Sequence, residues 1–126
     1  MQCLLHIAFC LLICSRISFA GDLVLTPVPR QALSEVRVTL TQPERQWLAQ
    51  KQLLVVGVLN DPLPPFRIFV EGQRLEGLVA DYVSALQREL GVPLQVRAFD
   101  ARSDMYAALR DGRIDMVSNV NALMAK

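Results

Sequence analysis

LLVVGVLND at residues 53–61 opens the stretch that decides the fold, and it is followed by PLPPF (62–66), LEGLVADYVSALQRELGVPLQV (75–96) and ALRDGRIDMV (108–117). Residues 53–59 are continuously apolar, which is typical of a strand buried on both faces of a parallel sheet. Residues 78–90 place their apolar side chains on one face of a helix, and Gly91 ends that helix. A buried strand and an amphipathic helix make the first half of a β-α-β unit.

The remainder of the stretch repeats this pattern. Residues 94–98 alternate between apolar and polar side chains, and an apolar run spans residues 114–117, so two further strands are predicted. A second helix lies between them and ends at Gly112. The order strand, helix, strand, helix, strand predicts an α/β fold, with a mostly parallel sheet as the middle of three layers.

Three further segments flank this unit. Thr41-Gln42-Pro43-Glu44 has the spacing of a capping box, which predicts a short helix over residues 41–51. Residues 66–77 contain the turn-forming Glu71-Gly72-Gln73 and predict a small hairpin. Residues 21–40 contain two prolines and show no clear period, so we interpret them as an extended lead-in.

The N-terminus has the character of a secretory signal peptide. Residues 4–13 form an apolar run that is shorter than the ~20 residues a membrane-spanning helix needs. Ser18-Phe19-Ala20 places small residues at the −3 and −1 positions of a cleavage site before Gly21. We expect a signal peptide over residues 1–20 and a periplasmic mature chain, with an uncleaved anchor as the alternative. All three cysteines, Cys3, Cys10 and Cys14, precede the cleavage site.

No catalytic constellation is visible in the mature chain. The single histidine, His6, lies in the expected signal peptide, and neither a P-loop nor a G-x-G-x-x-G motif is present. We therefore expect no enzyme activity, no cofactor and no metal, and we interpret the aspartates at 100, 104, 111 and 115 as solvated surface. Of the 13 basic residues only Arg16 precedes Gly21, which leaves 12 against 12 acidic residues and gives no support for nucleic-acid binding.

Candidate binding residues lie where the predicted strands end, because open parallel sheets bind ligands at the carboxyl ends of their strands. Phe66, in the loop after the first strand, offers an apolar face; the alternative is a stiff connector with Phe66 in the core. Ser118, Asn119 and Asn121 follow the third strand and offer hydroxyl and amide groups to a small polar ligand. The alternative for these three residues is ordinary turn chemistry.

The order LLVVGV, NDPLPPF, LEGLVADYVSALQRELGVPLQV and ALRDGRIDMV is similar to that of type II periplasmic solute-binding domains, in which two lobes close on a small solute like a flytrap. The lead-in LTQPERQWLAQKQLLVVGV (residues 40–58) resembles the start of flytrap domains in Bvg/Evg-type sensor histidine kinases. Membrane-bound lytic transglycosylases of the F type share part of the pattern. The resemblance covers about residues 38–121.

The resemblance implies that residues 41–121 form part of the first lobe of such a domain. It implies that Asp61 and Phe66 line the first segment of the cleft, and that Ser118, Asn119 and Asn121 contact the solute. Amino-acid-binding members clamp the solute carboxylate with an Arg shortly after this segment, whereas residues 122–126 here read Ala-Leu-Met-Ala-Lys. The implied partner is an amino acid or small carboxylate. The resemblance leaves open whether the longer parent protein forms a homodimer.

We therefore interpret the chain as a fragment of the periplasmic solute-sensing domain of a two-component sensor histidine kinase, with residues 122–126 as a truncated tail. One alternative is a fragment of a transporter-associated amino-acid-binding protein, against which the lead-in with Trp47 argues. The other alternative is the N-terminal regulatory domain of a membrane-bound lytic transglycosylase. A partial sheet of three strands with an unpaired edge would make the fold marginal.

Overall fold

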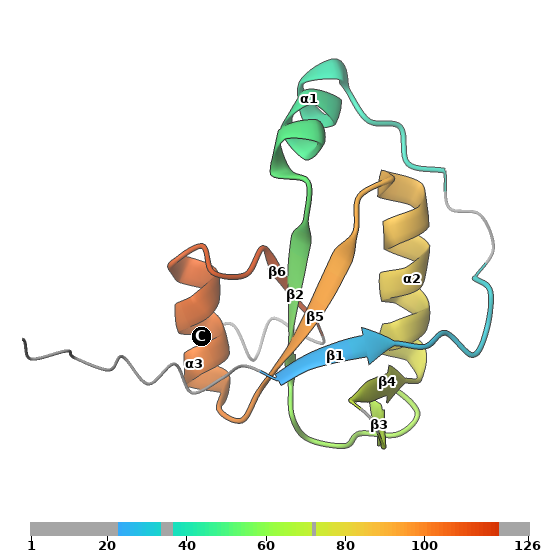
Figure 1. Cartoon of the computed structure of the whole chain (residues 1–126), viewed down its shortest axis with the longest axis vertical. Helices are drawn as coiled ribbons and strands as arrows, with labels where there is room; N and C mark the ends of the chain where they lie inside the picture. The colour runs from blue at the N-terminus through green and yellow to red at the C-terminus, as the bar shows by residue number, and fades with distance from the viewer. Residues whose placement is uncertain (1–22, 34–36, 72, 119–126) are drawn as a thin grey trace, which may run out of the picture.

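The computed structural model describes residues 23–33, 37–71 and 73–118, which form one sheet flanked by helices (Figure 1). Its strands are β1 (Leu23–Pro27), β2 (Leu54–Leu59), β3 (Ile68–Val70), β4 (Arg74–Glu76), β5 (Leu94–Phe99) and β6 (Met116–Val117). Its helices are α1 (Gln42–Lys51), α2 (Leu78–Leu90) and α3 (Arg102–Arg110). None of these helices is long and apolar enough to span a bilayer. The expected signal peptide lies outside the described residues.

The strands are ordered β3-β4-β1-β5-β2-β6 in the sheet. β2 pairs in parallel with both β5 and β6, as the β-α-β-α-β pattern predicts. The hairpin predicted over residues 66–77 is also present, because β3 and β4 pair antiparallel. The prediction of an α/β fold with a mostly parallel sheet is thus confirmed, whereas the expected number of three strands is wrong, because the described sheet has six.

One of the additional strands comes from the segment that was expected to be a lead-in. Residues 23–27 are extended, as predicted, but they form β1, which lies antiparallel to β5 and parallel to β4. Leu25 is buried in the core, and the N–H groups of Thr26 and Val28 donate to the carbonyl oxygens of Gln73 and Leu75, each at 2.8 Å. β1 therefore joins the hairpin to the parallel strands in a single sheet.

Alternate residues of β2 serve two separate cores, one on each face of the sheet. Val56 and Val58 lie in a cluster that includes buried side chains of α2, whereas Val55 lies in a second cluster with Met105 of α3. Figure 1 shows α2 and α3 on opposite faces of the sheet, with α1 beyond one end of β2. The continuous apolar run of β2 is thus explained by burial on both faces.

Gly57 permits the close approach of α3 to the centre of β2. A Cβ atom at this position would lie 2.6 Å from Cδ1 of Ile114 and 3.1 Å from Cγ of Met105. Both atoms belong to the core under α3. The glycine in this strand therefore marks a packing contact between strand and helix.

Both predicted features of the helix ends are present. The N–H of Thr41 donates to Oε2 of Glu44 at 2.7 Å, as a capping box requires. Hydrogen bonds from the hydroxyl and the N–H of Thr41 lower the pKa of the Glu44 carboxyl. At the other helix, Gly91 follows α2 in the left-handed conformation that glycine tolerates.

The chain after β1 is attached to α2 by a buried carboxylate. We call residues 28–33 the strap. The N–H groups of Arg30 and Gln31 donate to Oδ1 of Asp81 at 2.7 and 3.2 Å. Nε of Arg30 also donates to Oε2 of Glu76 at 2.6 Å, and Nη2 of Arg74 donates to Oε1 of the same carboxylate at 2.8 Å. The strap therefore connects β1, β4 and α2 through polar contacts.

The Glu76 carboxylate makes the stability of this region depend on pH. A hydrogen bond from Arg30 is the largest cause that holds the pKa of Glu76 below its ordinary value of 4.5; burial opposes the shift and Arg74 adds to it. Because the pKa is lower in the folded state, the stabilisation is fully present above the unfolded-state pKa and is lost as the pH falls through the folded-state pKa. We expect the urea midpoint to fall below about pH 4.5, and Glu76→Gln to flatten part of that fall. Identical pH profiles for both proteins would contradict this assignment.

Candidate functional site

Three polar side chains lie at the carboxyl ends of neighbouring parallel strands. Asn60 follows β2, Asp100 follows β5, and Ser118 follows β6. Nδ2 of Asn60 donates to Oδ1 of Asp100 at 2.9 Å, which joins two of these strand ends. We call this edge of the sheet the strand-end wall. Asp100 is exposed, as the sequence predicts, whereas Asn60 is not among the site residues predicted from the sequence.

Asp61 lies beside the strand-end wall but is already paired. Its Oδ1 accepts from Nη2 of Arg67 at 2.5 Å, and its backbone oxygen accepts from Nε of Arg67 at 3.2 Å. The side chain of Asp61 is 60% exposed, whereas that of Arg67 is 4% exposed. Asp61 therefore neutralises a buried guanidinium. The burial of Arg67 and its ion pair with Asp61 were not predicted from the sequence. An arginine in a segment of alternating apolar and polar residues next to a strand does not by itself indicate such a pair.

The loop between β2 and β3 is held against the N-terminus of α2. The first N–H groups of that helix, those of Leu78 and Val79, donate to the carbonyl oxygens of Pro65 and Phe66 at 3.1 and 3.0 Å. These donors would otherwise lack partners within the helix. Phe66 is 41% exposed, so the structure does not place it in the core. Phe66 is therefore presented by a loop whose backbone is fixed.

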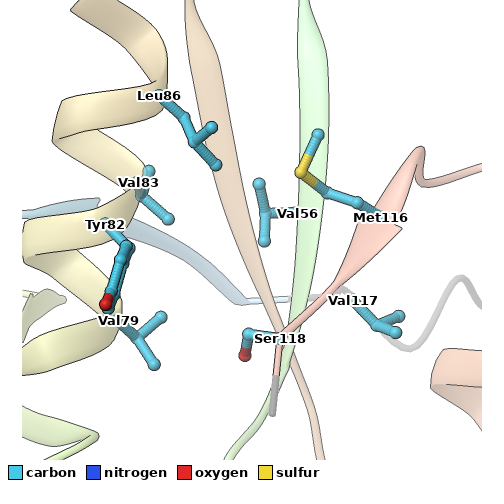
Figure 2. A pocket seen from close by; sticks show the side chains of 8 residues that line it. All are labelled: Val56, Val79, Tyr82, Val83, Leu86, Met116, Val117 and Ser118. Carbon is cyan, nitrogen blue, oxygen red and sulfur yellow. The ribbon is translucent and has the colours of Figure 1, made fainter. Parts of the chain in front are cut away.

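Ser118 carries the only buried side-chain polar atom without a hydrogen-bond partner among the described residues. Its backbone N–H donates to the carbonyl oxygen of Gly57 at 3.0 Å, which continues the pairing of β6 with β2. The side chain lies at one end of a hollow of about 270 Å³ between α2 and β6, shown in Figure 2, whose other lining residues are Val56, Val79, Tyr82, Val83, Leu86, Met116 and Val117. A buried hydroxyl without a partner among the described residues is a candidate hydrogen-bonding group for a ligand or a water molecule.

Val79 connects the two parts of the predicted site, the loop with Phe66 and the hollow with Ser118. This residue binds the Phe66 carbonyl through its N–H and lines the Ser118 hollow with its side chain. Asn119 and Asn121, which were also predicted to contact a ligand, lie outside the described residues. Within the described part of the chain, no group of three or more His, Cys, Asp or Glu side chains could hold a metal ion.

Comparison with known proteins identifies the family. Residues 54–122 match the model of the bacterial extracellular solute-binding proteins, family 3. The chain belongs to this family. The matched residues include β2, the loop with Phe66, both crossover helices and Ser118. The strand-end wall of this family 3 member is therefore contained in the segment that defines the family.

Two sensor proteins are among the relatives of this family 3 chain. It is 37% identical over 97 residues to the virulence sensor protein BvgS of Bordetella pertussis, covering 77% of this chain and 8% of that protein. It is 32% identical over 108 residues to the sensor protein EvgS of Escherichia coli K12, covering 82% of this chain and 9% of that protein. The chain thus spans less than a tenth of the length of these relatives. A membrane-bound lytic murein transglycosylase F of Shewanella halifaxensis is 32% identical over 82 residues, 65% of this chain and 17% of that protein.

Solved structures agree with the family assignment and with the similarity to BvgS. The periplasmic domain of B. pertussis BvgS superposes with a TM-score of 0.74 at 35% identity, covering 82% of this chain and 20% of that chain. The BvgS VFT2 domain superposes with a TM-score of 0.57 at 29% identity, covering 63% of this chain and 33% of that chain. The resemblance to a flytrap domain of Bvg-type sensors is confirmed, and the described residues correspond to part of one lobe.

Proposed function

We propose that this chain forms one wall of a small-solute-sensing domain in the periplasmic part of a two-component sensor histidine kinase. The single observation that supports this most strongly is the superposition on the BvgS periplasmic domain, at a TM-score of 0.74. BvgS and EvgS are named as sensor proteins, and both match across most of this chain. In this proposal the chain binds a small solute and transmits the signal of that binding. It has no catalytic role or nucleic-acid partner of its own.

The strand-end wall has groups suited to a small solute with one polar and one apolar part. Ser118 has a hydroxyl that can both donate and accept, and Asn60 presents a carboxamide that is shared with Asp100. Phe66 presents an exposed ring from a fixed loop. Because the carboxylate of Asp61 is neutralised by Arg67, we propose that Asp61 shapes this loop and does not serve as a free anionic contact.

Solute binding to this chain should be weak, because one exposed wall leaves most of a small solute in water. Binding pockets usually bury about 70–90% of a ligand. We expect dissociation constants of about 1 mM or weaker for a panel of amino acids and small carboxylates, as measured by calorimetry. In NMR titrations, the amide signals of Asn60, Phe66 and Ser118 should shift, and Ser118→Ala should abolish the shifts. A micromolar constant would show that this wall binds without a second lobe.

A lytic transglycosylase origin is the second candidate, supported by the match to the Shewanella enzyme. The two candidates differ in what the gene encodes after the codon for Lys126. A transmembrane segment and histidine kinase motifs would support the sensor. A lysozyme-like domain with a catalytic glutamate would support the transglycosylase, and a second lobe followed by a stop would support a transporter-associated binding protein.

We also propose that the mature chain is periplasmic. The apolar run at 4–13 and the Ser18-Phe19-Ala20 site support export and cleavage, and the solved relative is a periplasmic domain. Mass spectrometry of the chain expressed in a Gram-negative host should find Gly21 at the N-terminus of the periplasmic product. A membrane-bound product that retains Met1 would contradict cleavage.

A further inference from the structure

The three side chains of the strand-end wall lie on the face of the sheet that α2 covers. Successive residues of a strand point to opposite faces of a sheet, and the N–H groups of Asn60 and Ser118 continue the pairing of their strands. Two positions before the wall residues, the core under α2 includes Val58, Ala98 and Met116. One position before them, the core under α3 includes Leu59, Phe99 and Val117. Asn60, Asp100 and Ser118 therefore project toward the α2 side, where Figure 2 shows the Ser118 hydroxyl.

The contact between Asn60 and Asp100 decides which atoms the strand-end wall presents. A carboxylate only accepts hydrogen bonds, so the amide nitrogen of Asn60 must face it, and Nδ2 donates to Oδ1 of Asp100 at 2.9 Å. The carboxamide oxygen of Asn60 is then directed away from this bond, and Oδ2 of Asp100 takes no part in it. Both residues are exposed. The pair therefore presents two acceptor oxygens to a solute, against one remaining N–H of Asn60.

Two groups at this edge that would attract an anion are already bound within the chain. The guanidinium of Arg67 is buried and donates to the carboxylate of Asp61. The N-terminus of a helix attracts anions through its free N–H groups, but the first two N–H groups of α2 donate to the carbonyl oxygens of Pro65 and Phe66. Neither Arg67 nor these two N–H groups are therefore available to a solute carboxylate.

The two arginines that flank Asp100 in the sequence belong to the other face of the sheet. Arg97 alternates along β5 with Val96 and Ala98, which lie in the core under α2, so its side chain starts on the α3 side. Arg102 is the first residue of α3, and Figure 1 shows α3 on the face opposite to α2. The α2 side of the strand-end wall is therefore acidic in character.

Phe66 and Ser118 add groups that suit a cationic solute. Phe66 is 41% exposed, and the face of an aromatic ring carries negative partial charge that attracts an ammonium group. The same ring can also cover a short alkyl chain next to that group. The Ser118 oxygen, which is buried without a partner among the described residues, can accept a hydrogen bond. The wall thus combines acceptors with one apolar surface.

We propose that the strand-end wall binds the ammonium end of its solute through Asp100 and the carboxamide oxygen of Asn60, with Phe66 against the adjoining carbon chain. Resting on the function proposed above, this assignment makes the solute class a small primary amine, which includes amino acids. An amino acid binds with its amino group on the wall and its carboxylate directed away from Asp100. A small carboxylate without an amine binds poorly.

Two probes with the same alkyl chain and opposite charges test this assignment. Butylamine, a cation at neutral pH, and butyrate, an anion, are titrated into the isotope-labelled 126-residue chain at low ionic strength and followed by NMR. We expect butylamine to shift the amide signals of Asn60, Phe66 and Asp100 with a dissociation constant of about 10 mM or tighter, and butyrate to bind at least about threefold more weakly. Tetramethylammonium, a cation without an N–H group, should bind more weakly than butylamine, because it cannot donate hydrogen bonds.

Two variants that each remove one exposed negative charge separate the wall from the general field of the protein. Asp100→Asn keeps an oxygen that accepts from Asn60, and it should weaken butylamine binding at least about threefold without weakening butyrate binding. Asp104→Asn removes the same charge from the first turn of α3, and it should change butylamine binding less than about 1.5-fold.

The outcomes distinguish the solute class from the site itself. Equal losses for the two variants, or tetramethylammonium binding as tight as that of butylamine, would overturn the hydrogen-bonded ammonium. Butyrate binding as tight as that of butylamine would also overturn it, although shifts at Asn60 and Phe66 would still support a solute site on this wall. The absence of shifts with either probe at about 100 mM would overturn both the ammonium assignment and the proposed solute site.

Discussion

Replacing Gly77 with alanine should lower the free energy of unfolding by about 3–4 kcal/mol. Gly77 precedes α2 with φ 92° and ψ −170°, a conformation that is essentially restricted to glycine. A Cβ atom there would lie 2.5 Å from the carbonyl oxygen of Pro65 and 3.0 Å from that of Phe66. These oxygens accept the first two N–H groups of α2, so relief of the clash also breaks those hydrogen bonds.

Gly91→Ala is the matched control for this experiment. Gly91 ends the same helix with φ 65°, but apart from Gly91 itself and its two chain neighbours no heavy atom of the described residues lies within 4 Å of the position of its Cβ. Its substitution should cost only about 1 kcal/mol, from the left-handed backbone alone. Urea unfolding monitored by circular dichroism would measure both changes. Equal losses for the two variants would show that the contact with Pro65 and Phe66 is not what restricts Gly77.

Replacing Asp81 with alanine should cost about 3 kcal/mol and release the strap from α2. Asp81 is buried, and its Oδ1 accepts the N–H groups of both Arg30 and Gln31. Hydrogen bonds to a charged acceptor are worth more than neutral ones, and alanine leaves two partly buried donors without a partner. Hydrogen exchange should then accelerate at the Arg30 and Gln31 amides, and urea unfolding should report the loss of stability.

Two variants test this explanation. Asp81→Asn keeps an acceptor oxygen and should cost about 1 kcal/mol, with the strap still protected. Asp104→Ala removes an exposed acidic residue from the first turn of α3 and should cost about 0.5 kcal/mol through the helix dipole alone. If Asp81→Ala cost no more than Asp104→Ala, then Asp81 would act only on the helix dipole and not through the strap.

Local patterns predicted the elements of the parallel unit well. The apolar run of β2, the one-sided pattern of α2 and the Thr41–Glu44 capping box each reflect interactions within a few residues of chain. The strand ends with Phe66 and Ser118 followed from this element order, because parallel strands end at the same edge of a sheet. The family resemblance rested on the same residues, and the match over residues 54–122 confirms it.

Contacts between distant parts of the chain could not be predicted in this way. Asp81 binds a strap 51 residues away, and Asn60 meets Asp100 across 40 residues. Arg67 lies only six residues from Asp61, but its burial depends on how the loop packs against α2. In each case the side chain is chemically suited to several environments, and packing selects one of them.

The sequence by itself therefore determined the α/β class, the parallel strands β5, β2 and β6, and the edge of the sheet at which these strands end. Only the tertiary structure decided that β1 lies between β4 and β5, that Asp61 neutralises Arg67, and that a hollow lies between α2 and β6 in the described part of the chain. The physical reason is the range of the interactions. Helix periodicity, capping and burial on two faces are encoded in neighbouring residues, whereas strand insertion and buried ion pairs depend on the free energy of the whole packed fold.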